Sequence, residues 1–193
     1  MPFIPADALR VLAVLAVAPA AIGHGFVGFA VMFLVAGGTM LPRALGTVEW
    51  LDAVLCAAFL FAAWAALLDW YVAVWWLDLV VHAVVTGLLG VLAWEVTRWS
   101  RLLTRDSVRA RIAAAVVTIT SASTLAVLWE IGEWLGHTRL DDSIQVGYTD
   151  TMTDLVAGVL GAVGAGLLAA LAVDPPRDRS DEAREHGRLG ARP

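Results

Sequence analysis

Long apolar runs, broken by short polar stretches, make up most of this chain. A helix needs roughly 20 apolar residues to cross the hydrocarbon core of a bilayer. The first run, residues 9–41, is too long for one ordinary crossing, and we interpret it as two short helices broken near Pro19 and Gly23. The remaining runs predict one crossing each, at residues 53–68, 77–94, 112–134 and 152–173. The pattern therefore predicts an all-α polytopic transmembrane bundle of about six helices, in a single domain over residues 1–173.

The composition is that of a membrane protein. Hydrophobic residues make up 60% of the chain, and its mean hydropathy of +0.76 is far too high for a soluble globule of 193 residues. The net charge of -5 says little about partners, because the positions of charges matter more in such a protein. No basic patch is interleaved with exposed aromatic residues, so we expect no binding to nucleic acid.

The placement of arginine predicts the orientation. The densest basic cluster between two apolar runs lies between residues 94 and 112, and the positive-inside rule places it in the cytoplasm. Six crossings then put both termini in the cytoplasm. Residues 174–193 balance their charges and lack an apolar face, so we expect a disordered cytoplasmic tail. Alternatively, residues 1–20 are a signal peptide, whose cleavage would leave the remaining topology unchanged.

Other polar and aromatic residues at the ends of the runs have ordinary explanations. Asp52 and Glu95 fall near predicted cytoplasmic ends, where snorkelling or an Arg neighbour accounts for them. Aromatic side chains, typical of a membrane interface, crowd the turn at residues 69–76, namely Trp70, Tyr71, Trp75 and Trp76.

Six side chains of metal-ligand type remain, in pairs at the ends of three apolar runs. Spacings of three and four residues put each pair on one helix face. The predicted topology brings all three pairs to the outer side of the membrane, at one depth. The pairs are Asp78 with His82, Glu130 with Glu133, and Asp150 with Asp154.

The charge of this group needs compensation. A charged side chain in the hydrocarbon costs about 2.5 to 3.5 kcal/mol, and no Lys or Arg lies in these three outer halves. Either several carboxylates are protonated, or a bound divalent cation supplies the missing charge. The oxygen-rich set suits Mg²⁺, Mn²⁺, Ca²⁺ or iron, with Zn²⁺ possible through His82. We expect all six residues to bind metal, Glu130 and Glu133 to be catalytic, and Thr86 and Thr151 to support the ligands.

The helices that carry the pairs contain small residues suited to close packing. Ala157, Gly161 and Ala165 repeat at four-residue intervals below Asp154, a spacing that lets two helix backbones approach closely. Thr86 extends the face of Asp78 and His82 by one turn. Close backbones would bring the three pairs within reach of one ion.

Plainer interpretations stay open. The acidic residues could face external water, and Asp150 and Asp154 could favour the N-terminal end of their helix by capping. Glu130 argues against this, because we place it at a helix C-terminus, where the dipole disfavours an acid. His82 could be a hydrogen-bonded partner of a carboxylate, and Thr151 could cap its helix.

The order of these motifs resembles a known family. D-x-x-x-H at Asp78 to His82, W-E-x-x-E at Trp129 to Glu133, and D-T-M-x-D-L from Asp150, followed by a Gly-rich helix, resemble the YjdF-like bacterial inner-membrane proteins of unknown function. The resemblance covers roughly residues 75–172, and a looser one extends to VanZ-like membrane proteins. It implies a multi-pass helical protein of the bacterial inner membrane and supports the six positions as one unit. It supplies no reaction.

Three functions from different classes fit these features. The first is a metal-dependent enzyme that acts on a membrane lipid or lipid-linked phosphate, with a non-coordinating carboxylate as general base. The second is a proton- or cation-coupled transporter that uses the same carboxylates. The third is a non-catalytic envelope scaffold or resistance factor. The first is our main hypothesis.

Overall fold

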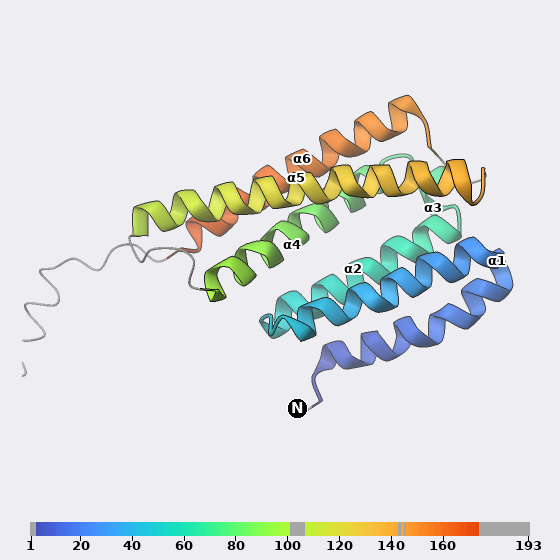
Figure 1. The fold of residues 1–193 in the computed structure, drawn as a ribbon, viewed down its shortest axis with the longest axis horizontal. Helices are drawn as coiled ribbons and strands as arrows, with labels where there is room; N and C mark the ends of the chain where they lie inside the picture. The colour runs from blue at the N-terminus through green and yellow to red at the C-terminus, as the bar shows by residue number, and fades with distance from the viewer. Residues whose placement is uncertain (1–2, 101–106, 143, 145, 174–193) are drawn as a thin grey trace, which may run out of the picture.

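The fold is entirely helical in the residues that the structure, a computed structural model, describes: 3–100, 107–142, 144 and 146–173. Five of the helices are long and apolar enough to cross a membrane, and α3 is a short turn of helix between two of them. The chain is therefore a multi-pass α-helical membrane protein, as predicted, while the expected tail at 174–193 lies outside the described residues. The helices are α1 (Pro5–Ala44), α2 (Glu49–Leu67), α3 (Trp70–Ala73), α4 (Leu77–Trp99), α5 (Ser107–Arg139) and α6 (Tyr148–Leu171) (Figure 1).

The longest helix, α1, consists of two antiparallel arms. Its backbone leaves helical geometry at His24 and Gly25, where Gly25 has a φ of 61° that favours glycine. The chain reverses there (Figure 1), so that the side chain of Arg10 reaches the carbonyl of Thr39 at 2.9 Å. Each arm has roughly 20 residues, or about 30 Å of helix. The described chain thus holds the six apolar rods that the sequence predicts, but Pro19 lies within an arm and does not break it.

The rods form two groups. The arms of α1 pack against α2, whereas α4, α5 and α6 pack against one another. The groups meet mainly where α2 touches α4, through a buried cluster of Leu51, Leu55 and Leu92. The three helices that carry the candidate ligands therefore form one compact unit.

Small residues set the spacing within that unit. The backbone of Gly161 in α6 lies directly against the backbone of Ala83 in α4. Gly90 of α4 also lies close to Thr118 of α5, since a Cβ added at Gly90 would lie 2.7 Å from the Thr118 carbonyl oxygen. The predicted close approach of helix backbones at the small residues around Gly161 is therefore confirmed.

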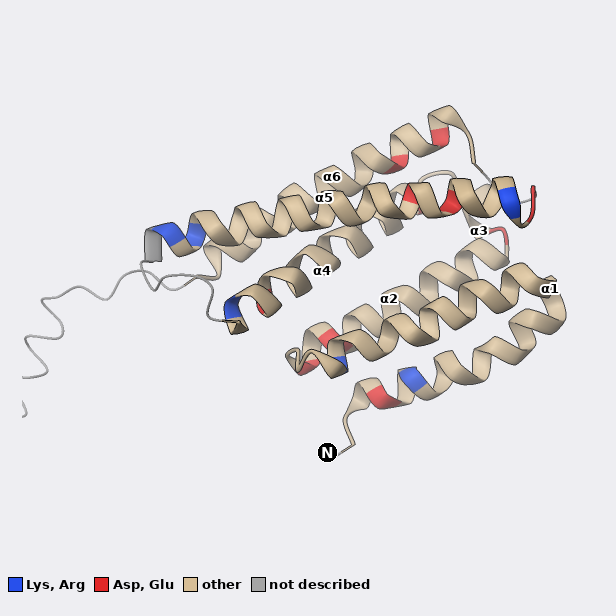
Figure 2. Cartoon of the chain, in the orientation of Figure 1, with Lys and Arg blue, Asp and Glu red and all other residues tan. Residues whose placement is uncertain are grey.

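Most charged residues lie toward the two ends of the bundle. The basic residues of α1, of the end of α4 and of the start of α5 lie toward one end, together with acidic residues of α1, α2 and α4, whereas the acidic residues of α5 and α6 lie toward the other end, as does a basic residue at the end of α5 (Figure 2). This placement fits the predicted alternation of crossings. The orientation across the membrane, with both termini in the cytoplasm, stays a prediction.

A buried ion pair joins α1 to α2. Arg10 and Asp52 are 5% and 1% exposed, and their side chains are in direct contact. The guanidinium group of Arg10 also donates a hydrogen bond of 2.8 Å to Asp7. An Arg neighbour therefore accounts for Asp52, and Arg98, at 2.8 Å from Glu95, does the same for Glu95.

The substitution Gly161→Ala should destabilise the packing of α4 on α6, because the new Cβ would collide with the backbone of Ala83. Overpacking of this kind costs about 1–3 kcal/mol. Unfolding in mixed detergent micelles, followed by circular dichroism, measures the loss. Gly164→Ala is the matched control, since a Cβ there meets nothing within 4 Å. Equal stability of the two variants would contradict the close contact.

The substitution Arg10→Ala should cost about 3–5 kcal/mol of stability, because it leaves the buried carboxylate of Asp52 without its partner. The same unfolding measurement tests this. Arg98→Ala serves as control: that side chain is 61% exposed, and losing its pair with Glu95 should cost less than about 1 kcal/mol. A loss for Arg10→Ala no larger than that for Arg98→Ala would show that the buried pair is not a structural requirement.

Candidate metal centre

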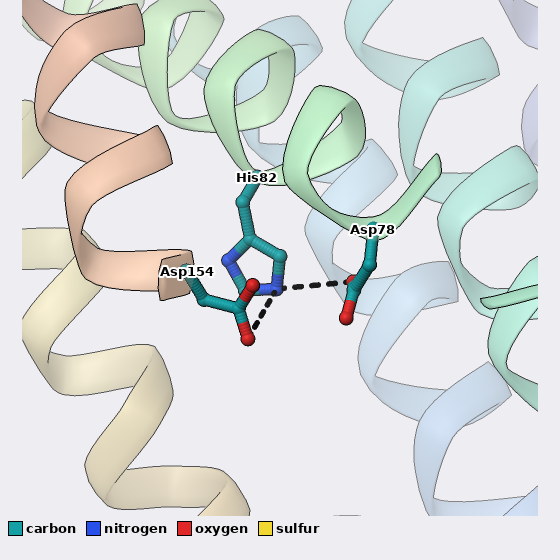
Figure 3. Close-up of side chains that lie close together, drawn as sticks. All are labelled: Asp78, His82 and Asp154. Carbon is teal, nitrogen blue, oxygen red and sulfur yellow. Dashed lines mark ion pairs between the residues drawn. The ribbon is translucent and has the colours of Figure 1, made fainter. Parts of the chain in front are cut away.

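His82 stands at the centre of the acidic group. It lies in the second turn of α4, one turn after Asp78, and its ring points toward α6. Figure 3 shows Asp78 and Asp154 converging on the same ring nitrogen from two different helices. Glu130, from α5, approaches the other ring nitrogen.

The distances define two groups of ligand atoms that share His82. Nε2 of His82 lies 3.4 Å from Oδ1 of Asp78 and 4.0 Å from Oδ2 of Asp154. Nδ1 lies 3.8 Å from Oε1 of Glu130. Asp78, His82 and Asp154 each offer one ligand atom within 4.8 Å of the others, and so do His82, Glu130 and Glu133. Five of the six predicted ligands thus come together.

These separations are longer than hydrogen bonds, which join nitrogen and oxygen at about 2.7–3.2 Å. Two ligands bound about 2.1 Å from one ion lie roughly 3.0–3.5 Å apart at octahedral or tetrahedral angles. The pair of His82 and Asp78, at 3.4 Å, falls within that range, and the other two lie a few tenths of an ångström beyond it. All three contacts are therefore too long for direct hydrogen bonds, and the contact between His82 and Asp78 has a length compatible with a shared ion.

Burial makes the charge of the group costly. Glu130 is 7% exposed and Asp154 is 3% exposed. Within the described residues, His82 is the only basic side chain within 4.0 Å of the carboxylates of Asp78, Glu130 and Asp154. Among the described residues, Oε1 of Glu130 is buried without a hydrogen-bond partner, although it faces the imidazole. A buried acceptor without a partner costs about 1–3 kcal/mol, so the burial of this carboxylate is unfavourable unless another group compensates for it.

Two expectations about helix ends need correction. Glu130 and Glu133 do not lie at a helix C-terminus, because α5 continues to Arg139. The dipole of the helix end therefore says nothing about Glu130. At α6 the N-cap is Gly147, without a side-chain cap, and Asp154 lies in the second turn. Asp150, in the first turn, still lies where the helix dipole favours an acid, so the plainer interpretation holds for Asp150 but not for Asp154.

Asp150 stands apart from the other predicted ligands. It occupies the third position of α6 and belongs to neither group of ligand atoms. Its charge still acts on Asp78, Glu130 and Asp154. A direct role for Asp150 in metal binding stays a prediction.

With this geometry in view, the comparisons with known proteins identify the family. Residues 8–175 match the family described as "Predicted membrane protein (DUF2238)". The chain belongs to this family. No curated protein and no solved structure matches it. Membership confirms the expected resemblance to a membrane family of unknown function, and it leaves the reaction open.

Tyr71 is a further residue near the site in this family member, and the sequence analysis assigned it only to the aromatic turn. Burial, with smaller contributions from the charges of Asp78, Glu133 and Asp154, raises the pKa of the Tyr71 phenol far above its usual range. The phenol therefore stays protonated and donates a hydrogen bond of 3.1 Å to the carbonyl of Ala62. Only the packing of α3 beside α4 reveals this proximity, because a tyrosine among tryptophans gives no separate signal in the sequence.

The two predicted supporting residues occupy different places. Thr86 is 6% exposed, one turn beyond His82, and packs against Gly158 of α6. Thr151 lies at the start of α6 and lines a cavity together with Glu130. Thr86 thus sits between two helices at the base of the site, and Thr151 sits beside one of its carboxylates.

Proposed function

We propose that this protein is a metal-dependent enzyme of the bacterial inner membrane, acting on a phosphate group of a membrane lipid or lipid-linked substrate. One observation carries the proposal. In the part of the chain that the structure describes, carboxylates from three helices gather around a single imidazole, with ligand atoms within 4.8 Å of one another in two groups, and Oε1 of Glu130 is buried there without a hydrogen-bond partner. A divalent cation would satisfy both the charge and the spacing.

The two sides of His82 suggest different roles. A neutral imidazole has one lone pair and one N–H, so it can bind an ion through only one nitrogen. Nε2 faces Asp78 and Asp154, which suits an ion, and Nδ1 faces Glu130, which needs a donor. A metal-bound histidine commonly donates its other N–H to a carboxylate, which fixes the ring. Glu130 then orients His82, and Glu133 remains as the candidate general base.

The donor set narrows the choice of ion. Mg²⁺ and Ca²⁺ prefer oxygen ligands alone, whereas imidazole suits iron and Zn²⁺, and carboxylates suit Mn²⁺. A mixed set of one imidazole and several carboxylates therefore favours Mn²⁺, iron or Zn²⁺. Such an ion would polarise a phosphoryl oxygen or lower the pKa of a bound water.

Protein purified without chelator should contain close to one equivalent of divalent metal, as measured by elemental analysis. Asp154→Asn should lose the metal, because it removes a charged ligand. Glu130→Gln should weaken metal affinity about 10–100-fold, the usual effect of removing a partner that orients a ligand. Glu95→Gln, which changes a carboxylate paired with Arg98, is the control and should keep the metal. Wild-type protein that binds none of these ions at saturating concentration would refute the proposal.

Phosphate release from lipid phosphates in proteoliposomes should depend on the metal and on Glu133. Glu133→Gln should keep its metal but lose about 10²–10⁴-fold in turnover, the range expected for a general base. Assays with a panel of lipid phosphates, with metal content measured on the same samples, test this. Metal-dependent ion flux through sealed vesicles without any phosphate release would favour the transporter instead.

A further inference from the structure

An open-sided cavity of about 270 Å³ lies between the second half of α5 and the start of α6. Its wall is apolar apart from two polar side chains, a composition typical of pockets that bind small molecules. The lining residues are Val127, Glu130, Ile131, Trp134, Val146, Thr151 and Leu155.

The cavity opens toward the bilayer. Val127, Ile131 and Trp134 are 45%, 46% and 53% exposed on a helix of membrane-spanning length. Apolar side chains exposed on such a helix contact lipid chains. Trp134 lies near the end of α5, at the level where tryptophan commonly marks the membrane interface. A lipid beside this groove would have its headgroup toward the Trp134 end of the groove and its chains toward Val127.

Glu130 connects the cavity to the candidate metal centre. It lines the cavity and also supplies a ligand atom to the group around His82. Among the described residues of the lining, it is the only charged one. Its carboxylate would repel a phosphate headgroup unless a cation bound on the other side of His82 offsets the negative charge, so a cation and an anionic lipid would favour each other's binding.

We propose that this cavity binds one hydrocarbon chain of a phosphate-bearing membrane lipid, which enters sideways from the bilayer between α5 and α6. The assignment of the phosphate headgroup rests on the proposed metal-dependent function, because the cation removes the repulsion by Glu130. The chain binds to the apolar wall, and the phosphate lies at the polar end formed by Glu130 and Thr151. The substrate class is therefore a lipid phosphate that never leaves the membrane during access.

Photochemical labelling of the full chain in proteoliposomes tests this proposal. The probes are phosphatidic acid with a diazirine in one acyl chain and the matching diacylglycerol without phosphate, and mass spectrometry maps the labelled peptides. We expect labels to concentrate at residues 127–134 and 151–155. Divalent cation should increase labelling by the phosphatidic acid several-fold and leave labelling by the diacylglycerol unchanged.

Cavity-filling variants provide the specific control. Leu155→Trp fills the cavity and should reduce labelling there about tenfold. Leu160→Trp makes the same change on the same helix at a position that is 66% exposed, and should have no effect. Val127→Trp and Leu128→Trp form a second pair on α5, in case one variant fails to fold.

Labels spread evenly over all the apolar helix faces, with no difference between the members of either pair, would overturn the proposal. The metal content of the same samples tests the proposed metal-dependent function separately from the chain-binding site. If the protein binds a stoichiometric ion but the labels are evenly spread, the metal centre is supported and the chain-binding site is refuted. If the labels are concentrated at the cavity and decrease in Leu155→Trp, but the protein binds no ion, the chain-binding site is supported and the metal-dependent reaction is refuted.

Discussion

The central constraint in this protein is the burial of carboxylates among helices whose outer faces must also be apolar enough to lie in a membrane. Glu130 and Asp154 are almost fully buried, and no arginine pairs with them among the described residues. Each buried charge costs several kcal/mol unless a partner compensates for it. The helices α4, α5 and α6 bring these carboxylates together around His82, and the proposed cation would compensate for their charge.

The chain meets the same problem differently in its other half. There, Asp52 is buried against Arg10, whose guanidinium group also reaches Asp7 and the backbone of α1. That network supplies its own positive charge and needs no ligand. The contrast is informative, because the described residues include both a buried carboxylate paired with an arginine and a group of carboxylates whose only basic neighbour within 4.0 Å is a histidine. The second arrangement is the one expected of a functional site.

Close backbone packing is what allows the acidic group to form. Gly161 brings α6 directly against Ala83 of α4, one residue beyond His82, and Gly90 does the same for α5. Larger side chains at these positions would separate the helices and move the ligand atoms beyond a shared distance. Two of these helices, α5 and α6, also leave an open-sided groove beside Glu130. The packing therefore determines both the centre and the route by which a lipid could reach it.

Local patterns in the sequence determined the membrane helices, their order, the pairing of acidic residues on single faces and the stripe of small residues. These features follow from length, hydropathy and helical periodicity, which act within one helix. Periodicity cannot set the rotation or the axial position of one helix against another, because side-chain packing between helices decides both. Only the tertiary structure therefore placed His82 between two carboxylate groups, left Asp150 outside them and brought Tyr71 close. The structure also shows that α5 extends beyond Glu130 to Arg139, because the polar residues after the apolar run continue the helix instead of ending it.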